Sequence, residues 1–442
     1  MGMTLALRLR QAGADVTLYE TAPSPGGLAH AQEIGGFTWD RFYHVILLSD
    51  RHLLGLLQDL GLGERLRWET TRTGFFVDGR LHSLSNSLEF LTFPPLNLLD
   101  KIRLGTTILR ASKIKNWQAL EKVFVTDWLK KWSGGRTFER IWLPLLKSKL
   151  GDNYQIASAA FIWAIIARMY AARRSGLKRE MFGYVEGGYA RVLAGFEARL
   201  QEEGIDLRFA TPIEEIRQEP DGVVLRTRSG LRFHHDEVVI TLPTTRIPGL
   251  VPQLAPPEVE QFKTVVYQGV ACLSLLLRRP LGGYYVTNIT DDWVPFTGVI
   301  EMTALVDPAT FGGYHLVYLP RYLTQDDPFW RCEDDEIEET FVQALERMYP
   351  GFTRADVVDA RVARAREVQA ISTLQYSTTL KPSLETSLPN VFVANSSQIA
   401  AGTLNLNETI GLAEAQATAL VQHLGRATRN RRPAPAKEVY DA

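Results

Sequence analysis

The sequence predicts an α/β protein of two or three domains. The chain has 442 residues, which is enough for a large core. It begins with a helix pattern followed closely by a strand pattern, as in half of a βαβ unit. Near its other end a buried-type strand, 388–395, leads into a helix that opens at Asn405. Between them, residues 250–375 combine strand patterns with an amphipathic helix pattern, which predicts a second sheet backed by helices. The strands are expected at 265–277, 284–289, 296–304 and 315–319, and the helix at 334–349.

The composition is that of an ordinary globular protein, with 45% hydrophobic and 22% charged residues. The formal net charge of −1 provides no overall field for nucleic acid, so we expect no nucleic-acid partner. The two cysteines, Cys272 and Cys332, form neither a CxxC pair nor a zinc pattern. We therefore expect no metal site and no disulfide-built fold, and a reducing compartment such as the cytoplasm.

Segments long enough to span a bilayer, roughly 18 to 20 apolar residues, do not occur. The most apolar stretch, 156–166, is interrupted by Ser158 and followed by Arg168. We interpret it as a buried helix, with a lipid-facing helix as the alternative. No signal peptide pattern is present at the start. Peripheral contact with a membrane stays open, because arginines gather near the C-terminus.

The first residues resemble part of a dinucleotide-binding unit. Such a unit has a strand, a G-x-G-x-x-G turn, a helix and then an acid that binds the ribose hydroxyls. Gly2 stands where the third glycine belongs, and Glu20 follows 18 residues later at the end of a strand pattern. The first strand and first two glycines are not in the sequence. We therefore expect the upstream coding region to encode them, and a sheet built without them to lack a central member.

Tandem glycines follow the acid in Pro25-Gly26-Gly27. Glycine tolerates backbone conformations that other residues avoid, so the pair allows a tight turn over a phosphate or ribityl chain. A plain surface turn is the alternative.

Together, Gly2, Glu20 and Gly26-Gly27 resemble the opening fingerprint of a large flavoprotein family. It contains amine oxidases, protoporphyrinogen oxidase and phytoene-type desaturases. The resemblance implies FAD as the cofactor. The family usually has an arginine after the two glycines. Leu28 stands in that place here, which leaves one phosphate contact without its usual side chain.

Two further segments resemble this family in the expected order. The segment 36–46 is similar to the one that runs under the flavin ring, which implies that His44 faces the isoalloxazine. A core or capping histidine is the alternative. The segment 186–193 resembles a family helix, and the strand after it implies that the main chain of Ile213 contacts the adenine.

The C-terminal part resembles the closing motif of the family. In that motif a strand contacts the ribityl-phosphate, and Asn395 replaces the usual acid. The next helix points its N-terminus at the flavin, so main-chain amides near Thr409 and Ile410 are expected at the pyrimidine edge. A helix N-terminus there stabilises the negative charge of the reduced ring.

The resemblance covers residues 2–424 and implies a discontinuous FAD-binding Rossmann-like domain of the glutathione reductase type. An α+β substrate domain is inserted into it. The FAD-binding domain is expected to comprise 1–50, 185–250 and 376–424, and the substrate or cap domain 51–184 and 251–375. Residues 425–442 are rich in arginine, proline and alanine, and are expected to form a disordered tail.

The family resemblance implies an oxidoreductase that transfers a hydride from an organic small molecule to the flavin N5. His44 is the one candidate base with positional support. Arg321 lies between Tyr318 and Tyr322, where it would hold an anionic substrate group or simply stack on rings. Two alternatives are a flavin-dependent isomerase that resembles UDP-galactopyranose mutase, and a non-catalytic flavoprotein relative. The sequence identifies neither the substrate nor the oligomeric state.

Overall fold

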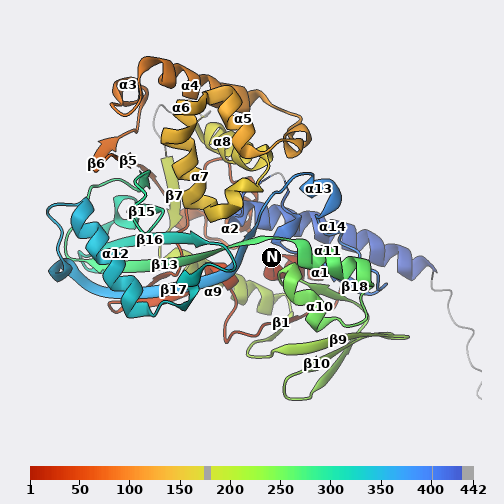
Figure 1. The fold of residues 1–442 in the computed structure, drawn as a ribbon. Helices are drawn as coiled ribbons and strands as arrows, with labels where there is room; N and C mark the ends of the chain where they lie inside the picture. Colours follow the sequence, from red (N-terminus) through yellow and green to blue (C-terminus); the bar gives the residue numbers. More distant parts are fainter. Residues whose placement is uncertain (174–180, 401, 431–442) are drawn as a thin grey trace, which may run out of the picture.

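The computed structural model describes residues 1–173, 181–400 and 402–430. Figure 1 shows three parts: a group of helices at the top, a large sheet on one side, and short parallel strands with long helices on the other. The parts are built from segments far apart in the sequence, as the colours show. The N-terminus lies among the short parallel strands.

The parallel strands form two separate pairs. Strand β1 (Thr17–Tyr19) pairs with β8 (Asp206–Arg208), and β12 (Val238–Ile240) pairs with β18 (Val391–Val393). In the described part of the chain no strand joins the two pairs. The two pairs are therefore separate sheets in this part of the chain.

Helix α1 (Gly2–Gln11) packs against both strand pairs. Its Leu5 belongs to a buried cluster with Phe392 of β18, while Leu7 lies in another cluster beside Leu18 of β1. Since all four side chains are apolar, burial against α1 stabilises each pair in the absence of a shared strand.

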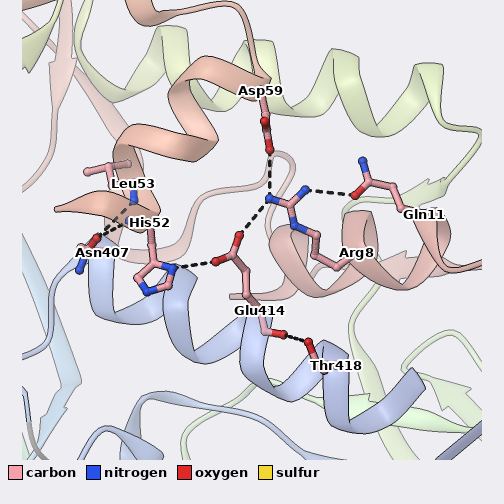
Figure 2. Close-up of polar contacts among 8 residues, drawn as sticks. All are labelled: Arg8, Gln11, His52, Leu53, Asp59, Asn407, Glu414 and Thr418. Carbon is pink, nitrogen blue, oxygen red and sulfur yellow. Dashed lines mark hydrogen bonds and ion pairs between the residues drawn. The ribbon is translucent and has the colours of Figure 1, made fainter. Parts of the chain in front are cut away.

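Polar side chains join α1 to helices α2 (Arg51–Asp59) and α14 (Leu406–Asn430) (Figure 2). The Arg8 guanidinium lies 3.0 Å from the Asp59 carboxylate and 2.9 Å from that of Glu414. Glu414 also lies 2.7 Å from Nδ1 of His52. One carboxylate therefore connects three helices.

The starts of α2 and α14 are held together by Asn407. Its Oδ1 accepts hydrogen bonds from the main-chain amides of His52 (2.9 Å) and Leu53 (3.3 Å) (Figure 2). These amides belong to the first turn of α2, which has no partner for them within the helix. As a result, two helix N-termini lie side by side.

Replacing Glu414 with glutamine is expected to lower the free energy of unfolding by about 1 kcal/mol, because two partly buried charged contacts are weakened. Chemical denaturation measures this. Asp15→Asn is the control, because Asp15 is fully exposed in its pair with Arg10 and should change stability by less than about 0.5 kcal/mol. Equal effects of the two changes would contradict the proposed connection.

The large sheet has seven strands in an order that joins distant segments. From edge to edge these are β17 (Val357–Ala370), β13 (Tyr267–Leu277), β16 (His315–Leu323), β15 (Gly298–Glu301), β14 (Val286–Ile289), β5 (Thr73–Val77) and β6 (Arg80–Ser83). The four strands predicted between 265 and 319 are present. The amphipathic helix predicted at 334–349 is α12 (Asp334–Met348), which packs on one face of the sheet.

Smaller antiparallel units complete the strands. They are β2 (Ala31–Ile34) with β3 (Phe37–Asp40), β4 (Leu66–Thr70) with β7 (Met181–Val185), and β9 (Ile213–Glu219) with β10 (Gly222–Thr227) and β11 (Arg232–His235). A hairpin around Asp78-Gly79 connects β5 and β6. Both turn residues have positive φ, 52° and 72°, as a tight two-residue hairpin turn requires.

The helical group lies beyond the β5–β6 edge of the sheet. Its helices are α3 (Ser87–Thr92), α4 (Leu98–Lys113), α5 (Val125–Ser133), α6 (Gly135–Thr137), α7 (Leu143–Leu150) and α8 (Ala159–Arg173). Helix α8 is the apolar stretch interpreted as a buried helix, and Phe161, Ile162 and Ile166 are indeed buried. Within the described ranges, no helix combines the length and the apolar character that crossing a bilayer requires.

The remaining helices are α9 (Gly188–Glu202), α10 (Ile247–Leu250), α11 (Pro256–Thr264) and α13 (Tyr376–Thr379). The disordered tail expected from residue 425 needs one correction. Helix α14 continues to Asn430, so residues 425–430 belong to this helix and not to a tail. The rest of that expected tail lies outside the described residues.

Candidate functional site

Two of the residues predicted to bind the cofactor, Glu20 and Gly2, lie near the parallel strands, and a third, Ile213, begins a neighbouring strand. Glu20 directly follows β1, and its amide donates to the Arg208 carbonyl at 2.9 Å. Its own carbonyl accepts from Thr211 at 2.9 Å, which places it beside the start of β9 at Ile213. Gly2 opens α1, and a Cβ there would lie 4.0 Å from Leu18 of β1. The carboxyl ends of parallel strands are where ligands bind in open α/β sheets.

The carboxylate of Glu20 is half-buried and accepts one hydrogen bond, from the Ala22 amide at 2.9 Å. A carboxylate has room for several hydrogen bonds, so this contact leaves Glu20 able to accept others.

The glycine pair forms a strained turn that has one crowded and one open side. Gly26 has φ 144°, and a Cβ there would lie 2.6 Å from the His30 ring and 2.7 Å from Leu193 of α9. Gly27 has φ 55°, and a Cβ there would meet no atom within 4 Å. Gly26 therefore leaves no room for a side chain, while the open side at Gly27 provides space next to the main chain for a ligand. Leu28 is half-buried and apolar, so it offers no phosphate contact.

The start of α14 lies against the same hydrophobic cluster as the glycine turn. Ile410 is buried in that cluster with Ala29 and with Ala6 of α1. Thr409 makes two contacts inside the helix, because both its amide and its hydroxyl donate to the Asn405 carbonyl, at 3.0 and 2.9 Å. The three segments predicted to bind one cofactor therefore share one core.

Two neighbouring cavities, of about 230 and 440 Å³, lie in front of the α2 and α14 N-termini. They share four lining residues: Ser49, Gly402, Asn407 and Glu408. Two helix N-termini give this space a positive potential, which suits an anionic group such as a pyrophosphate.

Asn395 lies at the end of β18 and is 2% exposed. Its Nδ2 donates to the Leu242 carbonyl at 2.7 Å, and its Oδ1 accepts from the Ser397 amide at 3.0 Å. The side chain thus ties the two strands of one pair together. A cofactor contact from Asn395 stays a prediction, and its side-chain atoms are already bonded within the protein.

His44 lies in a loop, with its ring 4.9 Å from that of Tyr189. Its Nδ1 is buried without a hydrogen-bond partner and lies 3.7 Å from the carboxylate of Asp40. Asp40 is 2% exposed and accepts from the Tyr189 amide at 2.7 Å. Burial, together with the nearby carboxylates, raises the pKa of the Tyr189 phenol well above its usual range, so it stays neutral.

The structure separates Arg321 from the two tyrosines beside it. Residues alternate between the two faces of a strand, so Tyr318 and Tyr322 share a face and Arg321 points the other way. Tyr318 donates to the Asp40 carbonyl at 2.5 Å, on the side of His44. Arg321 lies instead 4.3 Å above the ring of Phe329. His44 and Arg321 therefore do not meet, and the ring-stacked alternative describes Arg321.

An ion pair that the sequence did not predict borders the smaller cavity. Arg168 of α8 lies 3.1 Å from the carboxylate of Asp50, the residue before α2. Burial is the main cause that raises the pKa of Asp50, and Arg168 partly offsets it. The sequence feature that could have predicted this ion pair is the single Arg168 in an apolar helix pattern, because a buried charge needs a partner of opposite charge.

Metal binding has no candidate in the residues that the structure describes, where no three His, Cys, Asp or Glu side chains are grouped suitably.

Comparison with known proteins places these features in a family. A model described as flavin containing amine oxidoreductase matches residues 2–404. Coproporphyrinogen III oxidase of Mycobacterium tuberculosis (strain ATCC 25618 / H37Rv) is 26% identical over 294 residues, which cover 62% of this chain and 64% of that protein. The Mycobacterium leprae (strain TN) protein of the same name is 24% identical, with 63% and 65% covered. This chain thus spans less than two thirds of these curated relatives.

Solved structures share the fold. A protein from Exiguobacterium sp. 255-15, described as a candidate protoporphyrinogen oxidase, has a TM-score of 0.75 at 18% identity and covers 95% of this chain and 96% of its own. Putrescine oxidase bound to putrescine has a TM-score of 0.72 at 14% identity, with the same coverage. These likenesses confirm the predicted fold class.

Proposed function

Because this chain belongs to the family of flavin-containing amine oxidoreductases, we propose that it transfers a hydride from an organic substrate to N5 of a bound FAD. Membership of this family supports the flavin cofactor and the oxidoreductase class predicted from the sequence. One observation carries the proposal for this chain. The segments that carry Glu20, the Gly26-Gly27 turn and the start of α14 pack on one hydrophobic cluster, through Leu18, Ala29 and Ile410.

The residues fit an elongated dinucleotide. Glu20 would accept hydrogen bonds from the ribose hydroxyls, and the open side of Gly27 would adjoin the phosphates or the ribityl chain. The α14 N-terminus would stabilise negative charge on the ring system. When bound, FAD supplies the two-electron acceptor, and the protein supplies binding and orientation.

His44 is the proposed base. Its buried Nδ1 faces the Asp40 carboxylate, so an N–H held there would leave Nε2 as the nitrogen that accepts a proton. The Asp40 carboxylate, 3.7 Å away, would stabilise the resulting imidazolium, while the neutral Tyr189 ring fixes the plane of the imidazole from 4.9 Å.

The first substrate class to test is a porphyrinogen, because the curated relatives are named coproporphyrinogen III oxidase. Amines are second, because putrescine oxidase shares the fold. The isomerase alternative depended on Arg321 and His44 acting at one site. They lie on opposite sides of the β16 strand, so the structure offers that alternative no support.

The test is flavin absorbance of the purified protein, followed by anaerobic addition of coproporphyrinogen III, putrescine or UDP-galactopyranose. We expect an oxidised-flavin spectrum that bleaches with one of the first two compounds. Glu20→Gln should weaken FAD binding by about tenfold or more, the effect of losing a charged hydrogen bond. The exposed Glu219, at the far end of β9, is the control, and Glu219→Gln should bind FAD normally. Conversion of the sugar nucleotide without bleaching would overturn the proposal.

A further inference from the structure

An exposed group of apolar side chains covers the outer surface of helices α3 and α4. It comprises Leu88, Leu91, Leu98, Leu99, Ile102 and Leu109, which we call the leucine surface. Their exposed fractions range from 49% to 71%. These are six of the eleven large apolar side chains that are exposed among the described residues. The group lies at the outer end of the molecule, at the top of Figure 1.

Helix α4 has a second, separate apolar face. Leu104 and Ala111 point inward and are buried in the core of the helical group. Leu98, Ile102 and Leu109 lie four and seven residues apart, so they form one stripe on the outer face. Packing in the core of the helical group accounts for the apolar residues on the inner face of α4, but not for those on its outer face. A contiguous exposed stripe of this kind marks a contact surface for a partner or a membrane.

The helical region around this surface is strongly basic. Residues 87–150 contain twelve Lys and Arg against five Asp and Glu, an excess of seven positive charges, although the whole chain has a net charge of −1. Four basic side chains close to the leucine surface are exposed: Arg103, Arg110, Lys113 and Lys115.

Two of the five acidic residues of this region are buried and bonded within the protein. Asp100 is paired with Arg136, and Glu121 accepts a hydrogen bond from the Ser377 amide. Glu89 is half-buried and bonded to Ser83, while Asp127 and Glu139 are exposed. The exposed acids are few, so the region keeps its excess of positive charge.

We propose that the leucine surface binds the anionic surface of a lipid bilayer. Apolar side chains surrounded by lysine and arginine are the combination that inserts shallowly and is attracted to anionic lipid headgroups. The two cavities in front of α2 and α14 are lined by other segments, so the leucine surface is separate from them. A second copy would place two regions of like charge against each other, which disfavours self-association. The contact is peripheral, because none of the described helices can cross a membrane.

Vesicle co-sedimentation tests this proposal with the full-length protein loaded with FAD. We expect binding to vesicles that contain phosphatidylglycerol, about tenfold weaker binding to pure phosphatidylcholine, and loss of binding at high salt. The double variant Leu98→Gln/Ile102→Gln should bind at least about tenfold more weakly, since two inserting side chains are removed. Lys113→Gln/Lys115→Gln should reduce binding to anionic vesicles only.

The matched control is Leu231→Gln/Leu242→Gln, which alters two exposed leucines far from α4 in the sequence and should bind vesicles normally. The flavin spectrum reports that each variant is folded. Absence of binding to anionic vesicles by the folded protein would overturn the proposal. So would a dimer in analytical ultracentrifugation that the Leu98/Ile102 variant abolishes, because the surface would then belong to a second copy.

Discussion

The Arg168→Ala variant is expected to lose about 3 kcal/mol of unfolding free energy at pH 7, since it leaves the carboxylate of Asp50 buried without its partner. The Asp50 side chain is 4% exposed and that of Arg168 24%, so solvent compensates for the loss only in part. Urea denaturation measures the change. Lys263→Ala is the control, because its ion pair with Glu260 is exposed and contributes less than about 0.5 kcal/mol.

The loss in Arg168→Ala should shrink as the pH falls. Burial raises the pKa of Asp50 in the folded protein, so the folded state binds this proton more tightly than the unfolded chain. The free energy of unfolding therefore falls as the pH rises from the pKa of an ordinary aspartate to the pKa of Asp50 in the folded protein. Removing Arg168 raises the folded pKa of Asp50 further, so this pH range becomes wider. Adding Asp50→Asn to the variant should restore part of the stability at pH 7. An effect that does not change between pH 7 and pH 4.5 would contradict this account.

The Gly26→Ala variant is expected to lose about 3 kcal/mol of stability and most of its affinity for FAD. Its φ of 144° is strained for any residue with a Cβ, and the added carbon would lie 2.7 Å or less from His30 and Leu193. Thermal unfolding of the flavin-free protein and titration with FAD measure the two effects separately.

Gly27→Ala is the matched control for the crowding at Gly26. Its φ of 55° is left-handed and costs alanine about 1 kcal/mol, but no atom lies within 4 Å of the new Cβ. The flavin-free Gly27→Ala protein should therefore lose only about 1 kcal/mol of stability, less than Gly26→Ala. If FAD occupies the open side of this turn, as proposed, its affinity should still fall. Unchanged FAD affinity in Gly27→Ala would place the cofactor elsewhere.

Some elements could be predicted from the sequence because their signals are local. Helix α12 has apolar residues at helical spacing with acids in its first turn, and the Asp78-Gly79 hairpin requires two residues that tolerate positive φ. The Gly26-Gly27 turn and the acid after β1 depend on backbone freedom and on position along the chain. Such features depend on a few neighbouring residues, so a sequence pattern is enough to find them.

Strand β17 was not predicted, although it is 14 residues long. Its charged residues hide the alternation of a buried strand, and its pairing with β13 stabilises it. The parallel pairing of β5 with β14 likewise joins segments far apart in the sequence. Strand pairing is set by packing and by hydrogen bonds to distant partners, which a local pattern does not contain.

Residue type and spacing along the chain are enough to identify the family fingerprint, the α/β class and the turns that glycine makes possible. The ion pair between Asp50 and Arg168, which are 118 residues apart, depends on the folded arrangement, as does the separation of Arg321 from the side of His44. The exposure of the second apolar face of α4 among the described residues depends on it as well. Whether a side chain meets a partner, a cavity or solvent depends on the three-dimensional arrangement of all the other segments.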